Sequence, residues 1–120
     1  MTLDEKIALF EHCKKVLESR MSELEKAMAD AQESANSEEK SSAGDKYETG
    51  RAMSQIARDM SAKQLHQAKI DYKELMQLWP LTEQQLVQKG ALVQLSNGQT
   101  IFIATSLGLI SFDQQKIAVV

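Results

Sequence analysis

The chain has 120 residues and a formal net charge of −3, with an isoelectric point near 5.4, and 26% of its residues are charged against 42% hydrophobic. A surface of this sign gains nothing from counterion release on duplex nucleic acid, so direct binding to duplex DNA is not expected. Aromatic residues make up only 5% and there is one proline, so the composition disfavours a broad compact core and favours helices.

The cysteine, histidine and hydrophobic content excludes further classes. Cys13 is the only cysteine, so an intrachain disulfide is impossible and a single buried thiol in a reducing compartment is expected. His12 and His66 have no cysteine or carboxylate at ligand spacing, so neither is assigned to a metal. No N-terminal apolar run resembles a signal peptide and none is long enough to cross a bilayer, which predicts a cytoplasmic protein without membrane attachment.

A regular heptad pattern near the N-terminus predicts a long first helix. Thr2 and Glu5 have the spacing of a capping box, and neither Gly nor Pro occurs in residues 3–36. Apolar residues keep the seven-residue repeat of a coiled-coil strand, and a helix of this length is about 50 Å long. The seam consists of Leu3, Ile7, Phe10, Leu17, Met21, Leu24, Met28, Ala31 and Ala35, and Lys14 is the one polar residue at a seam position.

Small polar residues and glycine then break the heptad pattern and predict a loop whose tip covers residues 37–48. In the stretch 30–48, six acidic residues oppose only two lysines. Like charges gathered in one place raise the negative potential there, which suits a cation or a basic channel on another protein.

Asp45 and Glu48 lie three residues apart in this acidic stretch, and two interpretations of the pair are open. Asp at an N-cap with Glu three residues later is the start of a helix, where both carboxylates favour the positive end of the helix dipole. Alternatively, the two carboxylates point outward and share a hard divalent metal that another molecule mainly holds.

A second helix is predicted over residues 45–79, with Pro80 ending it. Its apolar residues follow steps of three and four, the spacing of one buried face. The face comprises Met53, Ala57, Met60, Gln64, Ala68, Tyr72, Leu75 and Trp79, widened by Ile56, Leu65 and Ile70. The two helical stretches together predict an antiparallel coiled-coil hairpin over residues 1–79.

Beyond Pro80 a capped single turn is expected at residues 82–85, after which the period changes to that of strands. Two strand-like runs flank Asn97-Gly98, a strong hairpin signal. The four runs cover residues 91–95, 100–105, 109–112 and 116–120. They predict a small antiparallel β domain over residues 80–120, an α+β fold overall, and an exposed sheet edge through which a homodimer could form.

This layout resembles the Gre transcript-cleavage factors of bacterial RNA polymerase, the GreA/GreB group. That family joins an N-terminal antiparallel coiled coil to a small C-terminal β domain of FKBP-like fold, and its tip reads Gly-Asp-Leu-Ser-Glu-Asn-Ala-Glu-Tyr. Here Gly44-Asp45-Lys46-Tyr47-Glu48 keeps the glycine and the spacing of the acids, whereas Thr49-Gly50-Arg51-Ala52 departs from the family. Gly90-Ala91-Leu92-Val93 resembles the start of the β domain, which is truncated here.

The resemblance implies a transcription elongation accessory factor. Its tip would enter the secondary channel of a backtracked RNA polymerase, where Asp45 and Glu48 would help hold a shared Mg²⁺ and stimulate transcript cleavage by the polymerase's own nuclease activity. No catalytic activity or cofactor of its own is implied. The alternative is a non-catalytic coiled-coil module that binds the polymerase or self-associates without stimulating cleavage.

Overall fold

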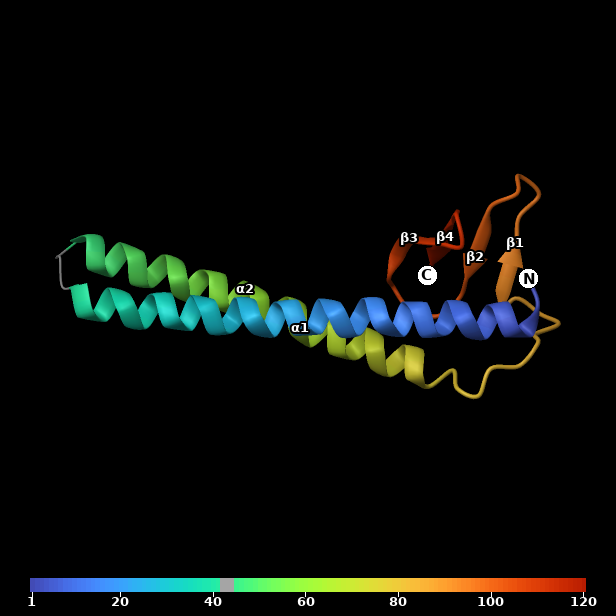
Figure 1. The fold of residues 1–120 in the computed structure, drawn as a ribbon, viewed down its shortest axis with the longest axis horizontal. Helices are drawn as coiled ribbons and strands as arrows, with labels where there is room; N and C mark the ends of the chain where they lie inside the picture. The colour runs from blue at the N-terminus through green and yellow to red at the C-terminus, as the bar shows by residue number, and fades with distance from the viewer. Residues whose placement is uncertain (42–44) are drawn as a thin grey trace. The chain divides into compact units, whose positions relative to one another are not determined.

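The computed structural model describes the backbone of residues 1–41 and 45–120 and the side chains of residues 1–37 and 48–120. The fold is α+β, with two helices followed by a small four-stranded sheet (Figure 1). The elements are α1 (Leu3–Ser41), α2 (Asp45–Met76), β1 (Leu92–Gln94), β2 (Thr100–Phe102), β3 (Gly108–Phe112) and β4 (Gln115–Val119).

The chain divides into two compact units, which are described separately. Unit 1 comprises Met1–Glu18 and Ile70–Val120, and therefore holds the first turns of α1, the last turns of α2 and the sheet. Unit 2 comprises Ser19–Lys69 and holds the remaining parts of both helices.

The first helix begins where its cap predicts. The backbone N–H of Glu5 donates a 3.2 Å hydrogen bond to Thr2 Oγ1, and the Thr2 hydroxyl donates to Glu5 Oε1 at 3.4 Å. Helix α1 extends to Ser41, beyond the predicted end at residue 36. Residues 38–40 are Glu, Glu and Lys, which favour helix, so the serines before them do not stop it.

The second helix ends earlier than predicted, at Met76 rather than Trp79. Because the ring of Pro80 disfavours the helical conformation at the residue before it, Trp79 cannot continue the helix. The chain instead tightens, and the N–H groups of Leu78 and Trp79 donate to the carbonyls of Leu75 and Met76. The single helical turn predicted at residues 82–85 is wrong, because residues 80–91 are irregular.

The sheet has the strand order β1-β2-β4-β3 and is mixed. β1 pairs with β2 and β3 with β4 in antiparallel fashion, whereas β4 lies between β2 and β3 and runs parallel to β2. The prediction of a purely antiparallel domain is therefore wrong. Each of the four strands overlaps one of the runs that the sequence predicted. The parallel pairing of β4 with β2, however, depends on contacts between distant segments, which a local sequence pattern does not reveal.

The predicted hairpin at Asn97-Gly98 is confirmed. Gly98 adopts a φ of 88° and donates its N–H to the Leu95 carbonyl at 3.0 Å, and Asn97 Oδ1 accepts from the N–H of Gln99 at 2.9 Å. The β3–β4 hairpin turns at Asp113 and Gln114, both with positive φ, as a two-residue turn requires.

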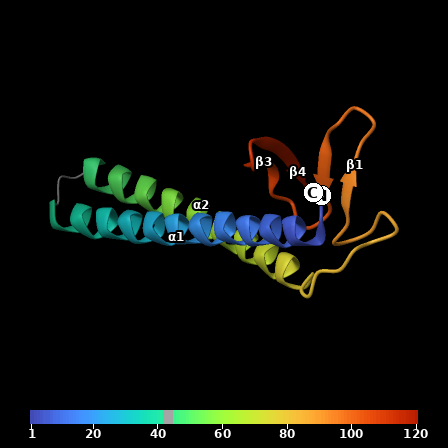
Figure 2. The ribbon, with the colours of Figure 1, turned by 45° about the vertical axis from the view of Figure 1, so that its right-hand side comes forward.

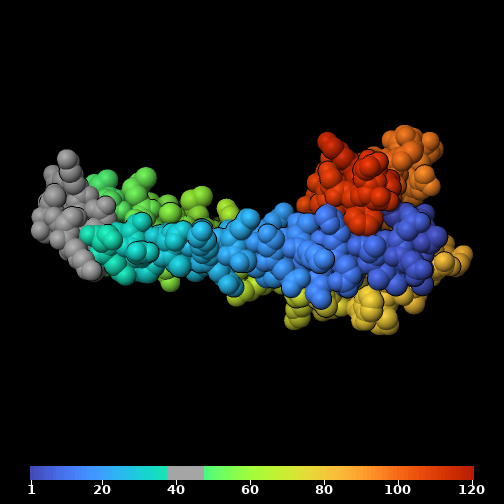
Figure 3. Space-filling view, viewed as in Figure 1, coloured from blue at the N-terminus to red at the C-terminus, as the bar shows by residue number. Residues whose placement is uncertain are grey.

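The core of unit 1 lies between one face of the sheet and the first turns of α1 (Figures 2 and 3). Alternate residues of the paired strands face this core, which fits the two-residue period of a strand. The fully buried side chains are Leu9, Phe10, Cys13 and Leu17 from α1, Leu75 from α2, and Phe102, Ile117 and Val119 from the sheet. The sequence therefore concentrates its large apolar residues in this unit.

In unit 2 the two helical segments lie side by side (Figures 1 and 2). The α1 seam residues Met21, Leu24, Met28 and Ala31 are partly buried and Ala35 is buried, as predicted. On α2 the predicted face is wrong over residues 53–64, where Met53, Ile56 and Met60 are 64%, 56% and 58% exposed and Ala57 and Gln64 are exposed too. The predicted residues Leu65 and Ala68 are buried. The covered side of α2 in this unit includes Ser54, Ser61, Ala62, Leu65 and Ala68.

The covered side of α2 includes polar positions that apolar spacing does not count. Ser54 and Ser61 are partly buried, and their small side chains allow close approach between helices. The side chains of Met53 and Met60 lie on the exposed side. The three- and four-residue apolar spacing therefore pointed to the wrong side of α2 over residues 53–64.

Candidate functional site

The predicted tip acids lie at the start of α2. The helix begins at Asp45, and Glu48 is in its first turn with an exposed side chain. Residues three apart on a helix are neighbours on one side of it, so the backbone places both positions on the same side of this turn. The side chains of Asp45, Lys46 and Tyr47 lie outside the described residues, as does Gly44, so neither the capping nor the metal interpretation is tested.

An acidic hollow lies on α1 of unit 2. It has a volume of about 350 Å³ and is lined by Asp30, Glu33, Ser34 and Ser37, which are spaced to share one helix face. Both carboxylates are exposed. The hollow is shallow and polar, and it extends the acidic surface along α1.

The two helical segments of unit 2 differ in charge. From Ser19 to Ser37, α1 carries Glu23, Glu25, Asp30 and Glu33 against Arg20 and Lys26. From Glu48 to Lys69, α2 carries Arg51, Arg58, Lys63 and Lys69 against Glu48 and Asp59. The ion pair between Arg58 and Asp59 is long, at 3.9 Å, and exposed, so it contributes little to stability. The acidity of this unit is thus a property of α1 and of the start of α2.

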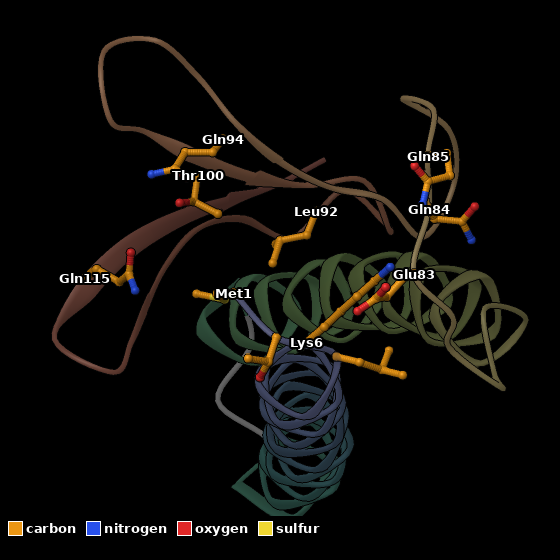
Figure 4. A pocket seen from close by; sticks show the side chains of 11 residues that line it. Met1, Lys6, Glu83, Gln84, Gln85, Leu92, Gln94, Thr100 and Gln115 are labelled. Atoms are coloured by element: carbon orange, nitrogen blue, oxygen red, sulfur yellow. The ribbon is translucent and has the colours of Figure 1, made fainter.

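A second candidate site, which the sequence did not indicate, is a polar pocket in unit 1 with a volume of about 430 Å³ (Figure 4). It combines the N-terminus of α1, the 81–90 loop and one end of the sheet. Its walls consist of Met1, Thr2, Leu3, Lys6, Glu83, Gln84, Gln85, Leu92, Gln94, Thr100 and Gln115.

Lys6 is the buried charged group of this pocket. Its side chain is only 5% exposed, and Nζ donates a 2.8 Å hydrogen bond to the carbonyl oxygen of Thr82. Burial lowers the pKa of Lys6 below its usual value, and the nearby Glu83 carboxylate partly opposes this change. Lys6 is not one of the seam residues of the heptad pattern, and a position outside the seam is normally solvated. Its burial results from the 81–90 loop, which returns to cover it.

Neither a cluster of metal ligands nor a membrane-spanning helix occurs in the part of the chain that the structure describes. Among residues 1–37 and 48–120, no three His, Cys, Asp or Glu side chains gather as metal ligands would. Within residues 1–41 and 45–120, neither helix has the length and apolar character that crossing a bilayer requires.

Comparison with known proteins returned no match. No protein-family description, no curated protein and no solved structure is significantly similar to the chain.

Proposed function

We propose that the protein is a Gre-like transcription elongation factor, which inserts the turn between α1 and α2 into the secondary channel of a backtracked RNA polymerase. The observation that carries this proposal is the start of α2 at Asp45 with Glu48 exposed in the same turn. That placement supports the correspondence of the two residues with the acidic pair of the Gre tip. The acidic surface of α1 favours a basic channel as the partner.

The proposal also covers the finer architecture. We infer that the helical segments of unit 2 form an antiparallel coiled-coil hairpin and that the sheet belongs to a small β domain of the FKBP-like Gre type. Support for the hairpin comes from partly buried Leu24 and Met28 on α1 and from buried Leu65 and Ala68 on α2. The sheet supports the β-domain assignment through its hairpin after Gly90-Ala91-Leu92-Val93.

In the proposed mechanism, the protein supplies metal ligands and not a complete active site. Carboxylate oxygens are the ligands that Mg²⁺ prefers, and it takes only one or two protein carboxylates while substrate phosphates and water fill the rest. Asp45 and Glu48 would contribute such oxygens to an ion that the polymerase holds at the RNA 3′ region. A metal so placed activates water and stabilises the leaving oxygen during phosphodiester hydrolysis. The polymerase remains the enzyme.

A transcript-cleavage assay on backtracked complexes of the cognate polymerase tests the proposal. The Asp45→Asn/Glu48→Gln variant keeps the shape of both side chains, and we expect it to lose cleavage stimulation at least a hundredfold while it still binds polymerase. The matched control is Glu23→Gln/Asp59→Asn, which removes two exposed carboxylates elsewhere in unit 2. Equal cleavage by the tip variant and the unaltered protein would refute the metal-sharing mechanism.

A second candidate function is a non-catalytic module that occupies the channel or self-associates. Lys46 beside Asp45 favours it, because a cation next to the carboxylate competes with a metal. The edge strand β3 offers a surface for pairing between copies, with Leu109 59% exposed on it. Polymerase binding without cleavage, or a dimer mass in solution, would select this function.

A further inference from the structure

The polar pocket of unit 1 lies between one face of the sheet and the N-terminal end of α1. The strand register places Leu92, Gln94, Thr100 and Gln115 on the same face as Phe102, Ile117 and Val119. The latter three are fully buried in the core. Gln94, Thr100 and Gln115 on this face are polar, and together with the first turn of α1 they line the pocket.

Lys6 provides a buried positive charge on one side of the pocket. An ammonium group has three N–H donors, and the Thr82 carbonyl accepts one of them. Figure 4 shows the side chain extending toward Glu83, whose carboxylate lies close enough to raise the pKa of Lys6 against the effect of burial. A buried cation with one neutral acceptor is poorly compensated, because burial disfavours charge unless it is paired and hydrogen-bonded.

Apart from Glu83, the other walls offer mainly hydrogen-bonding groups. The amides of Gln85, Gln94 and Gln115 line the hollow together with the nearly buried hydroxyl of Thr100, whereas the Gln84 amide donates to Thr82 Oγ1 and accepts from Gln88. Amides both donate and accept hydrogen bonds, so they suit a ligand with hydroxyl or amide groups. Glu83 disfavours a ligand that carries several negative charges.

We propose that this pocket binds a small monocarboxylate that also carries hydroxyl or amide groups. The carboxylate accepts the two remaining N–H groups of Lys6, and the hydroxyl or amide groups bond to the glutamine side chains of the walls. The site is independent of the proposed tip function, since every residue of it belongs to unit 1.

The test uses the full-length protein, labelled for amide NMR, with gluconate as the probe and sorbitol as its uncharged counterpart. We expect gluconate to shift the signals of Lys6, Gln94, Thr100 and Gln115 in a saturable way at millimolar concentration. Sorbitol should leave them unchanged. Equal responses to the two compounds, or no saturable shift by gluconate, would refute the proposal.

Two variants should change gluconate binding in opposite directions. Lys6→Met keeps the apolar stem and removes the ammonium, so affinity should fall at least tenfold. Glu83→Gln removes the neighbouring negative charge, so affinity should rise two- to fivefold. Unchanged affinity in Lys6→Met, or weaker binding in Glu83→Gln, would contradict the proposal.

Two further measurements complete the test. If Lys6→Met does not fold, Thr100→Val replaces it, and loss of the hydroxyl should weaken gluconate binding two- to fivefold. Inorganic phosphate, with its greater charge and no hydroxyl chain, should bind more weakly than gluconate. Tighter binding of phosphate, or unchanged binding in Thr100→Val, would overturn the assignment of the ligand class.

Discussion

The hydroxyl of Thr105 donates a 3.1 Å hydrogen bond to Oε2 of Glu74 and so joins the segment after β2 to the last turns of α2. Thr105 is only 2% exposed, whereas Glu74 is at the surface. The bond links residues 31 positions apart within unit 1. It therefore links the segment after β2 to α2 beside the core residues Ala104 and Leu75.

Replacement of Thr105 by valine should lower the unfolding free energy by about 1 to 2 kcal/mol. The new methyl group fits the same space, but a hydrogen bond to a charged group is lost. Urea denaturation monitored by circular dichroism measures the change. The control is Ser106→Ala at the neighbouring exposed position, for which a change within about 0.5 kcal/mol is expected. Equal effects of the two substitutions would show that the bond contributes nothing.

The exposed face of α2 predicts a contrast between two apolar residues five positions apart. Leu65→Ala removes a buried side chain and should cost about 2 to 3 kcal/mol. Met60→Gln changes an exposed residue to another good helix former and should alter the unfolding free energy by less than about 0.5 kcal/mol. Thermal unfolding of the two variants distinguishes the faces. A loss in Met60→Gln as large as that in Leu65→Ala would mean that the face of α2 is reversed.

Burial of Cys13 predicts a loss of stability in alkaline solution. Its thiol is fully buried, and desolvation raises the pKa from 9.0 to about 12. Between these values the folded chain keeps the thiol proton that the unfolded chain releases. The unfolding free energy therefore falls with rising pH in this window, by up to about 1.4 kcal/mol per pH unit.

The Cys13→Ala variant isolates this effect. At pH 8 the variant should be less stable, because it lacks a buried sulfur atom and leaves a cavity. From pH 9 toward 12 its deficit relative to the unaltered protein should shrink. Urea denaturation at one-unit pH intervals measures the difference. A deficit that stays constant over this range would contradict the role of the thiol proton.

The positive φ of 88° at Gly98 predicts a purely backbone effect. Nothing lies within 4 Å of the position that a Cβ atom would take, so alanine meets no clash there. Gly98→Ala should still cost about 1 kcal/mol, since L-residues disfavour this conformation. Gly98→Asn should cost less, because asparagine tolerates positive φ better. The two midpoints of thermal unfolding provide the comparison, and an equal loss in both variants would contradict this explanation.

The candidate site could be predicted only in part from the sequence. The small polar residues and glycine placed the break between the helices within residues 37–48, and the structure narrows it, since α1 extends to Ser41 and α2 begins at Asp45. Lys6 could not be found in this way. Its spacing matches a solvated position, and it is buried by Thr82, which lies 76 residues later in the chain.

The sequence by itself determined the elements whose causes are local. The Thr2 cap, the end of α2 before Pro80 and the turn at Asn97-Gly98 each depend on residues within a few positions. Only the tertiary structure decided which side of α2 is covered, the parallel pairing of β2 with β4, and the burial of Lys6. These features depend on the free energy of packing between distant segments, where side-chain size at the contact outweighs local pattern.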